Sequence, residues 1–302
     1  MRERLLNALV DCGRMIPPAF AWRLGAGLGA LVGSLPLRDA RRCREHLTIA
    51  YPEKEAAWIR RTARATFRHF GAMALWTFAT LRRDPRALSR GVMLEGGDNL
   101  RGLIRACRRG EGTVGFTGHV GNWELVSRLG ALVLPLTVVG RRLRSPLADK
   151  LVQGARVASG AHLVYQDADL REFTRELRSG RILATLTDQD IPRLAGVFVP
   201  WYGRLAWTPS GPAALAQLTR SAVQPAFLYR RAGRWVLHFG PRRRFARSGD
   251  LAADVRAITA WTTAYQESIV RRAPEQWAWW HKRWRTRPED RPDEAAVSER
   301  LG

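Results

Sequence analysis

Residues 113–130 read TVGFTGHVGNWELVSRLG, and this stretch decides the fold. Its first part is a short apolar run bounded by glycines, which is typical of a buried strand. Gly121 and Asn122 interrupt the run, and the apolar residues after them recur at helical spacing. Asn is a favoured N-cap residue, so we expect a helix to begin there. A buried strand that leads through a tight turn into a helix is the building unit of an α/β protein.

The same alternation continues along the chain. Further strands are predicted at 92–96, 136–140, 161–165, 182–188, 196–203, 223–231 and from 234 onwards, and helices at 98–109, 145–159, 168–178, 208–221 and 250–272. Short connections between alternating strands and helices predict an α/β fold with a mostly parallel central sheet flanked by helices. Sites on such sheets gather at the carboxyl ends of the strands, where His119 and Asp188 are both expected to lie.

The composition indicates a globular protein with an anionic partner. The chain has 302 residues, of which 46% are hydrophobic, and its formal charge is +23. Nearly all of the positive charge is arginine, since lysine occurs only at 54, 150 and 282. Such a field attracts nucleic acid or an anionic membrane surface. The three cysteines are widely spaced, with no CxxC pair, so neither a zinc site nor a disulfide framework is expected.

The N-terminal region has the composition of a membrane anchor. Residues 15–36 are about as long as a bilayer span and carry one charge, Arg23, before the basic block RDARRCR at 38–44. The segment is a membrane span, an interfacial anchor or a helix packed on the domain, and the sequence leaves these three open. We therefore expect a hydrophobic and basic membrane-associating helical region over 1–44 and one catalytic domain over 45–302. That domain begins with helices over 45–81, one of them opened by Pro52.

His119 and Glu124 are the candidate catalytic pair. The sequence has no GxSxG elbow, HExxH helix, Walker A loop or complete GxGxxG after a strand. Within one continuous helix, a separation of five residues would turn the two side chains away from each other. They can meet only if His119 ends the strand, Gly121 makes the turn and Asn122 caps a helix that carries Glu124 in its first turn.

In that geometry His119 is a general base, and Glu124 fixes its tautomer and stabilises the imidazolium. The nucleophile would then be the hydroxyl group of an acceptor substrate. The alternative is structural: His119 is a hydrogen-bonded turn residue, and Glu124 is a carboxylate at a helix N-terminus. The spacing alone does not decide between the two.

Five motifs together carry a family resemblance. They are GHVGNWEL at 118–125, DQD at 188–190, GVFVPWYG at 196–203, TPSG at 208–211 and PEQWAWWHKRW at 274–284. In order and spacing they resemble the lipid A biosynthesis acyltransferases, the lauroyl and myristoyl transferases within the lysophospholipid and glycerolphosphate acyltransferase superfamily. The resemblance covers about 24–287 and includes HLTIAYPE, where His46 stands in place of the expected Asn.

This resemblance implies site residues. The family's His-x4-Glu/Asp motif falls on His119 and Glu124, and Arg156 and Asp188 are further active-site positions, with Asn122 supporting the transition state or substrate. An arginine would meet a phosphate or a developing oxyanion with a fork of donors. On the residues alone, Arg156 also fits a solvated helix position and Asp188 a turn cap.

Two aromatic clusters have a functional and a structural interpretation each. Phe198, Trp201 and Tyr202 are candidates for the wall of an acyl pocket, although such a run is more often core. The tryptophans at 277–284, interleaved with basic residues, suit a membrane interface or a helix end packed on the core.

The function expected from the resemblance is O-acyl transfer at the cytoplasmic face of the inner membrane, by a peripheral or single-pass protein. The donor would be an acyl carrier protein thioester, the acceptor an anionic lipid A precursor, and no metal or prosthetic group is expected. The alternative is an acyltransferase for phosphatidylinositol mannoside or another envelope lipid that uses acyl-CoA. A nucleic-acid-binding protein is disfavoured, because no such module appears and the basic residues are spread along the chain.

Overall fold

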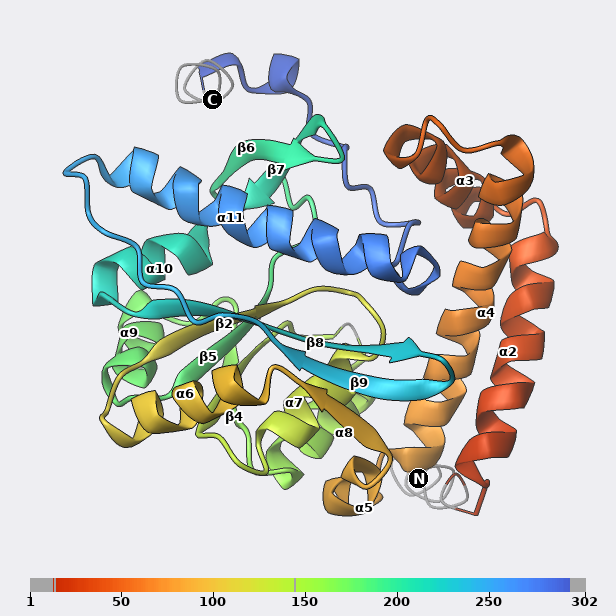
Figure 1. Cartoon of the computed structure of the whole chain (residues 1–302), viewed down its shortest axis with the longest axis horizontal. Coiled ribbons are helices and arrows are strands. Elements are labelled where there is room, and N and C mark those ends of the chain that lie inside the picture. The colour runs from red at the N-terminus through yellow and green to blue at the C-terminus, as the bar shows by residue number, and fades with distance from the viewer. Residues whose placement is uncertain (1–12, 14, 144, 294–302) are drawn as a thin grey trace.

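A sheet in the order β1-β9-β8-β2-β5-β3-β4 runs through the computed structural model, which describes residues 13, 15–143 and 145–293 (Figure 1). Its neighbouring strands are parallel except for β8 and β9, which form an antiparallel hairpin. The strands are β1 Val92–Glu95, β2 Thr113–Thr117, β3 Leu136–Gly140, β4 His162–Tyr165, β5 Ile182–Leu186, β8 Ala222–Arg231 and β9 Arg234–Phe239. The predicted α/β class with a mostly parallel sheet is confirmed.

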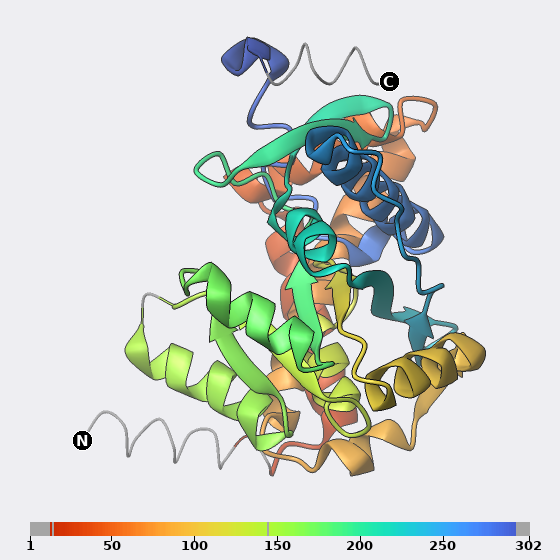
Figure 2. The ribbon, with the colours of Figure 1, turned by 90° about the vertical axis from the view of Figure 1, so that its left-hand side faces the viewer.

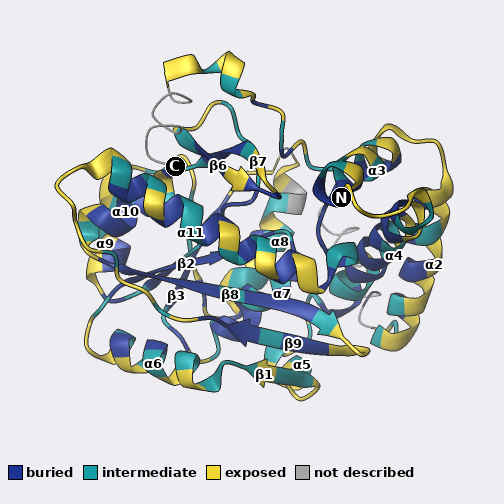
Figure 3. Ribbon diagram, turned by 45° about the horizontal axis from the view of Figure 1, so that its top comes forward, coloured by how far each residue is buried: buried dark blue, intermediate teal, exposed yellow. Residues whose placement is uncertain are grey.

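Helices cover both faces of this sheet (Figures 1 and 2). One face carries α6 Gly97–Arg108, α7 Trp123–Gly130 and α8 Pro146–Ala158, and the other carries α9 Leu170–Arg178, α10 Gly211–Thr219 and α11 Leu251–Arg272. The short α5, Pro85–Ser89, precedes β1. The strands β2 and β8 are almost wholly buried between these layers (Figure 3). Side chains from β2, β5 and α11 meet in the largest core cluster, which includes Phe116, Leu183 and Ile258.

A separate hairpin lies beyond α11, away from the sheet, formed by β6 Gly196–Trp201 and β7 Arg204–Pro209. The sequence predicted only the first of these strands. Tyr202 and Gly203 both have positive φ, of 52° and 73°, which makes the tight two-residue turn of a β-hairpin. The turn brings Trp207 opposite Phe198, and both rings are buried. The predicted helix at 208–221 therefore begins only at Gly211.

The N-terminal helices form a layer at one end of the sheet. They are α2 Pro18–Ser34, α3 Arg38–Ala50 and α4 Ala56–Thr80. α2 lies along α4, and glycines at the contact let the two backbones touch. A Cβ added to Gly25 would lie 2.3 Å from the carbonyl oxygen of Gly71, which is too close for any side chain. The expected boundary between 44 and 45 falls inside α3, and α4 starts after Pro52, which lies in a turn instead of opening the helix.

The length and hydropathy of the helices bear on membrane insertion. Among the described residues, no single helix is both long enough and apolar enough to cross a bilayer. The pair α2 and α3, bent by 83°, satisfies the two criteria only when taken together. Of the cysteines, Cys43 is buried and Cys107 half-buried, both as free thiols, while Cys12 is outside the described residues.

Candidate active site

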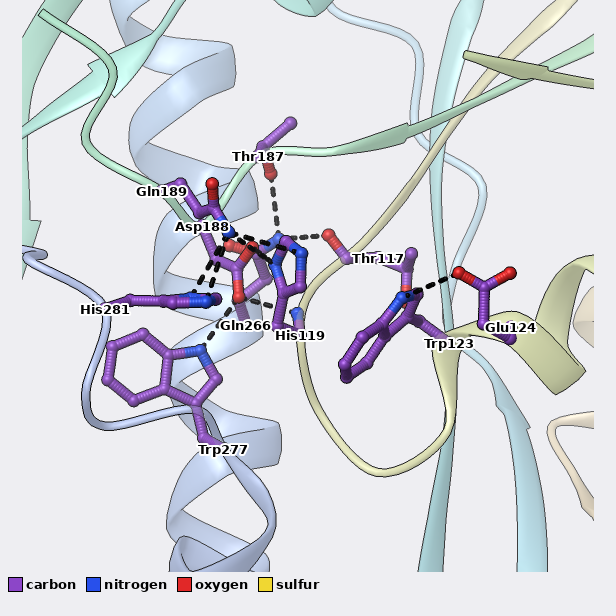
Figure 4. A network of polar contacts seen from close by, with 10 residues as sticks. All are labelled: Thr117, His119, Trp123, Glu124, Thr187, Asp188, Gln189, Gln266, Trp277 and His281. Atoms are coloured by element: carbon purple, nitrogen blue, oxygen red, sulfur yellow. Dashed lines mark hydrogen bonds and ion pairs between the residues drawn. The ribbon is translucent and has the colours of Figure 1, made fainter. Parts of the chain in front are cut away.

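His119 and Asp188 meet because β2 and β5 are neighbours in the sheet. Thr117 pairs with Leu186 at the carboxyl ends of these parallel strands, and each chain continues for two residues to its site residue. The imidazole Nδ1 of His119 lies 2.8 Å from Oδ1 of Asp188, and the backbone N–H of His119 donates to Oδ2 at 2.6 Å (Figure 4). The predicted placement of both residues at strand ends is confirmed.

Asp188 is buried and ionised. Its residue is 1% exposed, and Oδ2 also accepts a hydrogen bond from Trp277 Nε1 at 2.8 Å. Burial raises the pKa of the carboxyl group, but the charge and hydrogen bond of His119, the charge of His281 and the indole N–H outweigh it, so the pKa lies well below its usual range. A carboxylate can only accept, so Nδ1 of His119 carries a proton, and in the neutral imidazole Nε2 then presents a lone pair.

Glycines allow the close approach of these segments. A Cβ on Gly118 would lie 3.0 Å from Asp188 Oδ2 and would press on the carboxylate. Gly121 has φ of 58°, and its Cβ would lie 1.9 Å from the carbonyl oxygen of Leu228, so no other residue fits there. The break between strand and helix that the sequence predicted at this point is confirmed.

Asn122 caps α7, as predicted. Its Oδ1 accepts from the backbone N–H of Leu125 at 3.0 Å, and its Nδ2 donates to Thr77 Oγ1 at 3.2 Å. The residue is fully buried, so its side chain holds the turn together and is turned away from solvent.

The carboxylate of Glu124 is bound to Arg156, and the expected contact with His119 is wrong. Arg156 Nε and Nη2 donate to the two oxygens of Glu124 at 3.0 and 2.7 Å, and the indole of Trp123 donates to Oε1 at 3.1 Å. The ring of Trp123 stands between the two residues, with its centroid 4.8 Å from that of the imidazole (Figure 4). Because α7 starts at Trp123, Glu124 faces α8 instead of the end of β5.

Arg156 is mostly buried and paired, and it is not a solvated helix arginine. Its side chain is 12% exposed, and besides its forked bond to Glu124 it donates from Nη1 to Gln153 Oε1 at 2.9 Å. The fork of two parallel hydrogen bonds fixes both side chains. Arg156 and Glu124 thus form one rigid polar unit that joins α8 to α7.

A narrow apolar cavity of about 60 Å³ adjoins this polar unit. It lies between the sheet and the layer of α6, α7 and α8, and it runs along β2 from Thr117 to Thr113. Trp123 and Arg156 contribute to its wall near His119, and the rest is mostly aliphatic: Leu103, Val126, Leu134, Leu136, Val138, Ile182, Ala184, Leu186 and Ala226. A narrow apolar cavity beside a candidate base suits a hydrocarbon chain.

The residues predicted to wall an acyl pocket lie elsewhere. Phe198 and Trp201 on β6 are fully buried, and Tyr202 is 7% exposed with its hydroxyl 2.8 Å from that of Tyr51. These three side chains are part of the packing between the hairpin, α3 and the C-terminal segment. The structural interpretation of this aromatic run is therefore correct, and the cavity is built from the sheet and α7.

The tryptophan-rich segment after α11 packs on the core and closes the site from one side. Trp277 and Trp279 are fully buried, so the core interpretation of these two rings holds. Besides Trp277, the segment brings His281 to the site, with its ring centroid 4.8 Å from that of His119. Gln189 lies between the two imidazoles. Sequence reasoning missed these three residues, although the DQD and PEQWAWWHKRW motifs contain them.

Comparison with known proteins shows the family of the chain. The family of bacterial lipid A biosynthesis acyltransferases matches residues 4–286. The lipid A biosynthesis lauroyltransferase of Escherichia coli is 27% identical over 282 residues, covering 92% of this chain and 89% of the relative. The palmitoleoyltransferase of the same organism and an acyltransferase of Shigella flexneri, both of lipid A biosynthesis, are each 24% identical over 268 residues, 88% of this chain and 85% of theirs. The chain is therefore a member of the bacterial lipid A biosynthesis acyltransferase family, and an O-acyltransferase by class.

Proposed function

We propose that this protein moves a fatty acyl group from the thioester of acyl carrier protein to a hydroxyl of a lipid A precursor or a related envelope glycolipid. The observation that carries the proposal is the lone pair of His119 Nε2, fixed by Asp188, beside an apolar cavity. A base, a donor to the oxyanion and correct positioning suffice for this reaction, because a thioester is already activated. The proposed reaction needs no metal or prosthetic group.

His119 moves one proton in each half of the reaction. Nε2 takes the proton of the acceptor hydroxyl as that oxygen attacks the carbonyl carbon, and the C=O electron pair moves onto the carbonyl oxygen. When the tetrahedral intermediate collapses, the C–S bond breaks and the departing thiolate receives the proton from Nε2. Asp188 stays ionised throughout and stabilises the imidazolium, the role that the sequence assigned to Glu124.

The acyl chain would occupy the cavity along β2. The aliphatic walls supply the apolar surroundings that a hydrocarbon tail requires, and Arg156 with Trp123 stands where a chain in the cavity would reach the thioester. The ion pair with Glu124 balances the positive charge of the buried Arg156 guanidinium when no substrate anion is near it. A phosphate of the acceptor would compete with Glu124 for the same forked donors.

The excess of positive charge supports anionic partners. A formal charge of +23 draws both a phosphorylated acceptor lipid and an acidic carrier protein toward the molecule. This attraction acts on the rate of encounter and weakens with salt. The donor's identity as carrier protein is therefore tested by the salt dependence of the rate, which the uncharged pantetheine thioester should not share.

Helix α2 supports association with the membrane. Its small residues Ala21, Gly25 and Gly29 are buried, and its outward side carries large exposed apolar residues: Phe20, Leu24, Leu28, Leu31 and Val32. A helix whose outward side meets water normally shows the opposite pattern, with polar residues on that side and apolar ones facing the core. Small residues at the helix contact and large apolar ones outside are the arrangement that suits lipid. We therefore place α2 at the cytoplasmic face of the inner membrane, lying in its apolar layer.

Acyl transfer by the purified protein tests the proposal. The protein in phospholipid vesicles is given acyl carrier protein thioesters and a lipid A precursor, and the products are identified by mass spectrometry. We expect one acyl group to be added by the wild type and none above background by His119→Ala of equal thermal stability. Transfer by His119→Ala at the wild-type rate would overturn the assignment. Reaction only with acyl-CoA and phosphatidylinositol mannoside would establish the alternative acceptor instead.

A further inference from the structure

The side-chain amide of Gln189 lies between the imidazoles of His119 and His281. Its nitrogen is 3.3 Å from Nε2 and 3.5 Å from Nδ1 of His119, and 3.3 Å from Nε2 and 3.4 Å from Nδ1 of His281. Because it is nearly equidistant from the two nitrogens of each ring, the amide nitrogen lies beside the base without being aligned with the lone pair of either Nε2. Its N–H groups are therefore not committed to one ring nitrogen.

His281 is the second ring in contact with the same NH₂ group. Burial of the imidazole lowers the pKa of His281 to about 4, so the ring is neutral at pH 7. The amide is therefore held between the two rings, beside the base.

The backbone around Gln189 is also held firmly. Each residue of the DQD motif contacts one residue of the C-terminal segment: Asp188 contacts Trp277, Gln189 contacts His281, and Asp190 accepts from the backbone and hydroxyl of Thr286. The two bonds from Thr286 are 2.6 and 2.8 Å long. A preorganised amide of this kind is what electrostatic catalysis requires.

We propose that Gln189 donates a hydrogen bond to the carbonyl oxygen of the thioester as that oxygen becomes an oxyanion, and that His281 is the positioning residue for this amide. The inference rests on the proposed acyl transfer. The acceptor hydroxyl binds the lone pair of His119 Nε2, and an N–H of Gln189 beside that ring is available to the oxyanion.

The geometry favours Gln189 over the other donors of the site. The attacking oxygen is hydrogen-bonded to Nε2 and becomes bonded to the carbonyl carbon, so the oxyanion forms next to the base and within reach of a group 3.3 Å from it. Three of the five N–H donors of Arg156 are bound to Glu124 and Gln153, and the indole N–H of Trp277 is bound to Asp188. Among the residues that the structure describes, the N–H groups of Gln189 contact only the two imidazoles.

Substitution of Gln189 tests the donor. We expect Gln189→Ala to lower kcat by about 10²–10³-fold with little change in KM, the usual effect of removing one oxyanion donor. Gln189→Glu, which is isosteric but cannot donate when ionised, should be no more active. A dithioester donor, whose C=S sulfur is a poor acceptor, should slow the wild type strongly and Gln189→Ala little. The proposal would be overturned if the dithioester lowered the rate of the wild type and of Gln189→Ala by the same factor. A near-normal kcat of Gln189→Ala with the ordinary thioester would also overturn it.

Substitution of His281 tests the positioning role. His281→Ala should lower kcat by about tenfold or more, and His281→Asn, whose amide oxygen can accept from Gln189, should restore part of that loss. His46→Ala is the matched control, because His46 binds the backbone of the same segment at the carbonyl oxygen of Trp279 and has no contact with Gln189 among the described residues. It should leave kcat unchanged. If His281→Ala and His46→Ala lost equal activity and Asn gave no rescue, His281 would be merely structural.

The failures of the two proposals are distinguishable. If the wild type transfers no acyl group from any thioester, the proposed function fails. If the wild type is active and Gln189→Ala matches it in kcat and dithioester sensitivity, only the oxyanion assignment fails.

Discussion

The imidazole of His119 is held by Asp188, 69 residues further along the chain, with 2.8 Å between Nδ1 and Oδ1. Glu124, five residues away and part of the same motif, is instead bound to Arg156. The two carboxylates therefore have separate tasks: Asp188 fixes the tautomer of the base, and Glu124 fixes the guanidinium at the wall of the cavity. The predictions that follow rest on this division.

Asp188→Asn should nearly abolish turnover. An amide that donates to Nδ1 would force the proton of the imidazole onto Nε2, where the acceptor hydroxyl needs a lone pair. By analogy with other acid–imidazole pairs, kcat should fall about 10³–10⁴-fold. Steady-state kinetics on the purified variant measure this. Circular dichroism must show a native fold, and a kcat within tenfold of wild type would contradict the pairing.

Glu124 and Arg156 should be strongly coupled in a double-mutant cycle. Both side chains are mostly buried, so removing one leaves the other charge without its partner. We expect a coupling free energy of about 1–3 kcal/mol from urea unfolding of the two Ala variants and the double variant. The control cycle of Glu124 with His119 should give less than about 0.5 kcal/mol. If the coupling free energy of Glu124 with His119 were as large as that of Glu124 with Arg156, His119 and Glu124 would be in contact after all.

Ala184→Leu should shorten the acyl chain that the protein transfers. Ala184 lines the cavity midway along β5, and three further carbon atoms there would fill part of its length. The chain-length distribution of the product, measured by mass spectrometry with a mixture of thioesters, should shift to shorter chains. Ala214→Leu is the control, because Ala214 lines a different groove between α9, α10 and the start of α11. An unchanged distribution in Ala184→Leu would place the acyl chain elsewhere.

The fold should lose stability as the pH falls from 7 to 5. Burial, and for His281 also the charge of His119, lowers the pKa values of His69 and His281 to about 4, below the ordinary value of 6.5. Between pH 7 and pH 5 the unfolded chain therefore binds protons at these histidines that the folded protein does not bind. Their contribution to the free energy of unfolding is present in full only above pH 6.5. Each histidine should account for about 2 kcal/mol by pH 5.

Urea unfolding at several pH values measures this slope. His69→Gln removes one of the titrating groups, which also include His46 and His238 with lowered pKa values, and should reduce the slope. Asp188 titrates below this range and should not contribute. A slope that is the same in His69→Gln would show that this histidine is not the source.

Polar residues on the outward side of α2 should weaken membrane binding. Leu28 and Leu31 are 51% and 61% exposed, and lipid would cover this area at about 1 kcal/mol for each side chain. Leu28→Gln with Leu31→Gln should lower partitioning onto anionic vesicles by about tenfold or more in a flotation assay. Leu251→Gln, on an equally exposed leucine at the start of α11, should have no effect. Equal binding of all three proteins would exclude α2 as the lipid contact.

The sequence by itself determined the local elements and the turn at the site. Periodic apolar residues marked most of the strands and helices, because burial on one face or two leaves a signature within a single segment. Gly121 and Asn122 likewise predicted a turn and a helix cap, because the conformations of these two residues depend on the neighbouring backbone alone. The hairpin strand β7 was missed because its pairing with β6 depends on a two-residue turn that the pattern of 196–209 does not mark.

Only the tertiary structure decided the partners of the site residues. That Asp188 reaches His119 depends on β5 lying beside β2 in the sheet, and the strand sequence does not specify the order of parallel strands. That Trp277 and His281 complete the site depends on a segment that returns from the far end of α11. Contacts between distant segments are selected by the packing of the whole core. Glu124 is close to His119 in the sequence, but the residue that binds the imidazole of His119 in the structure is Asp188.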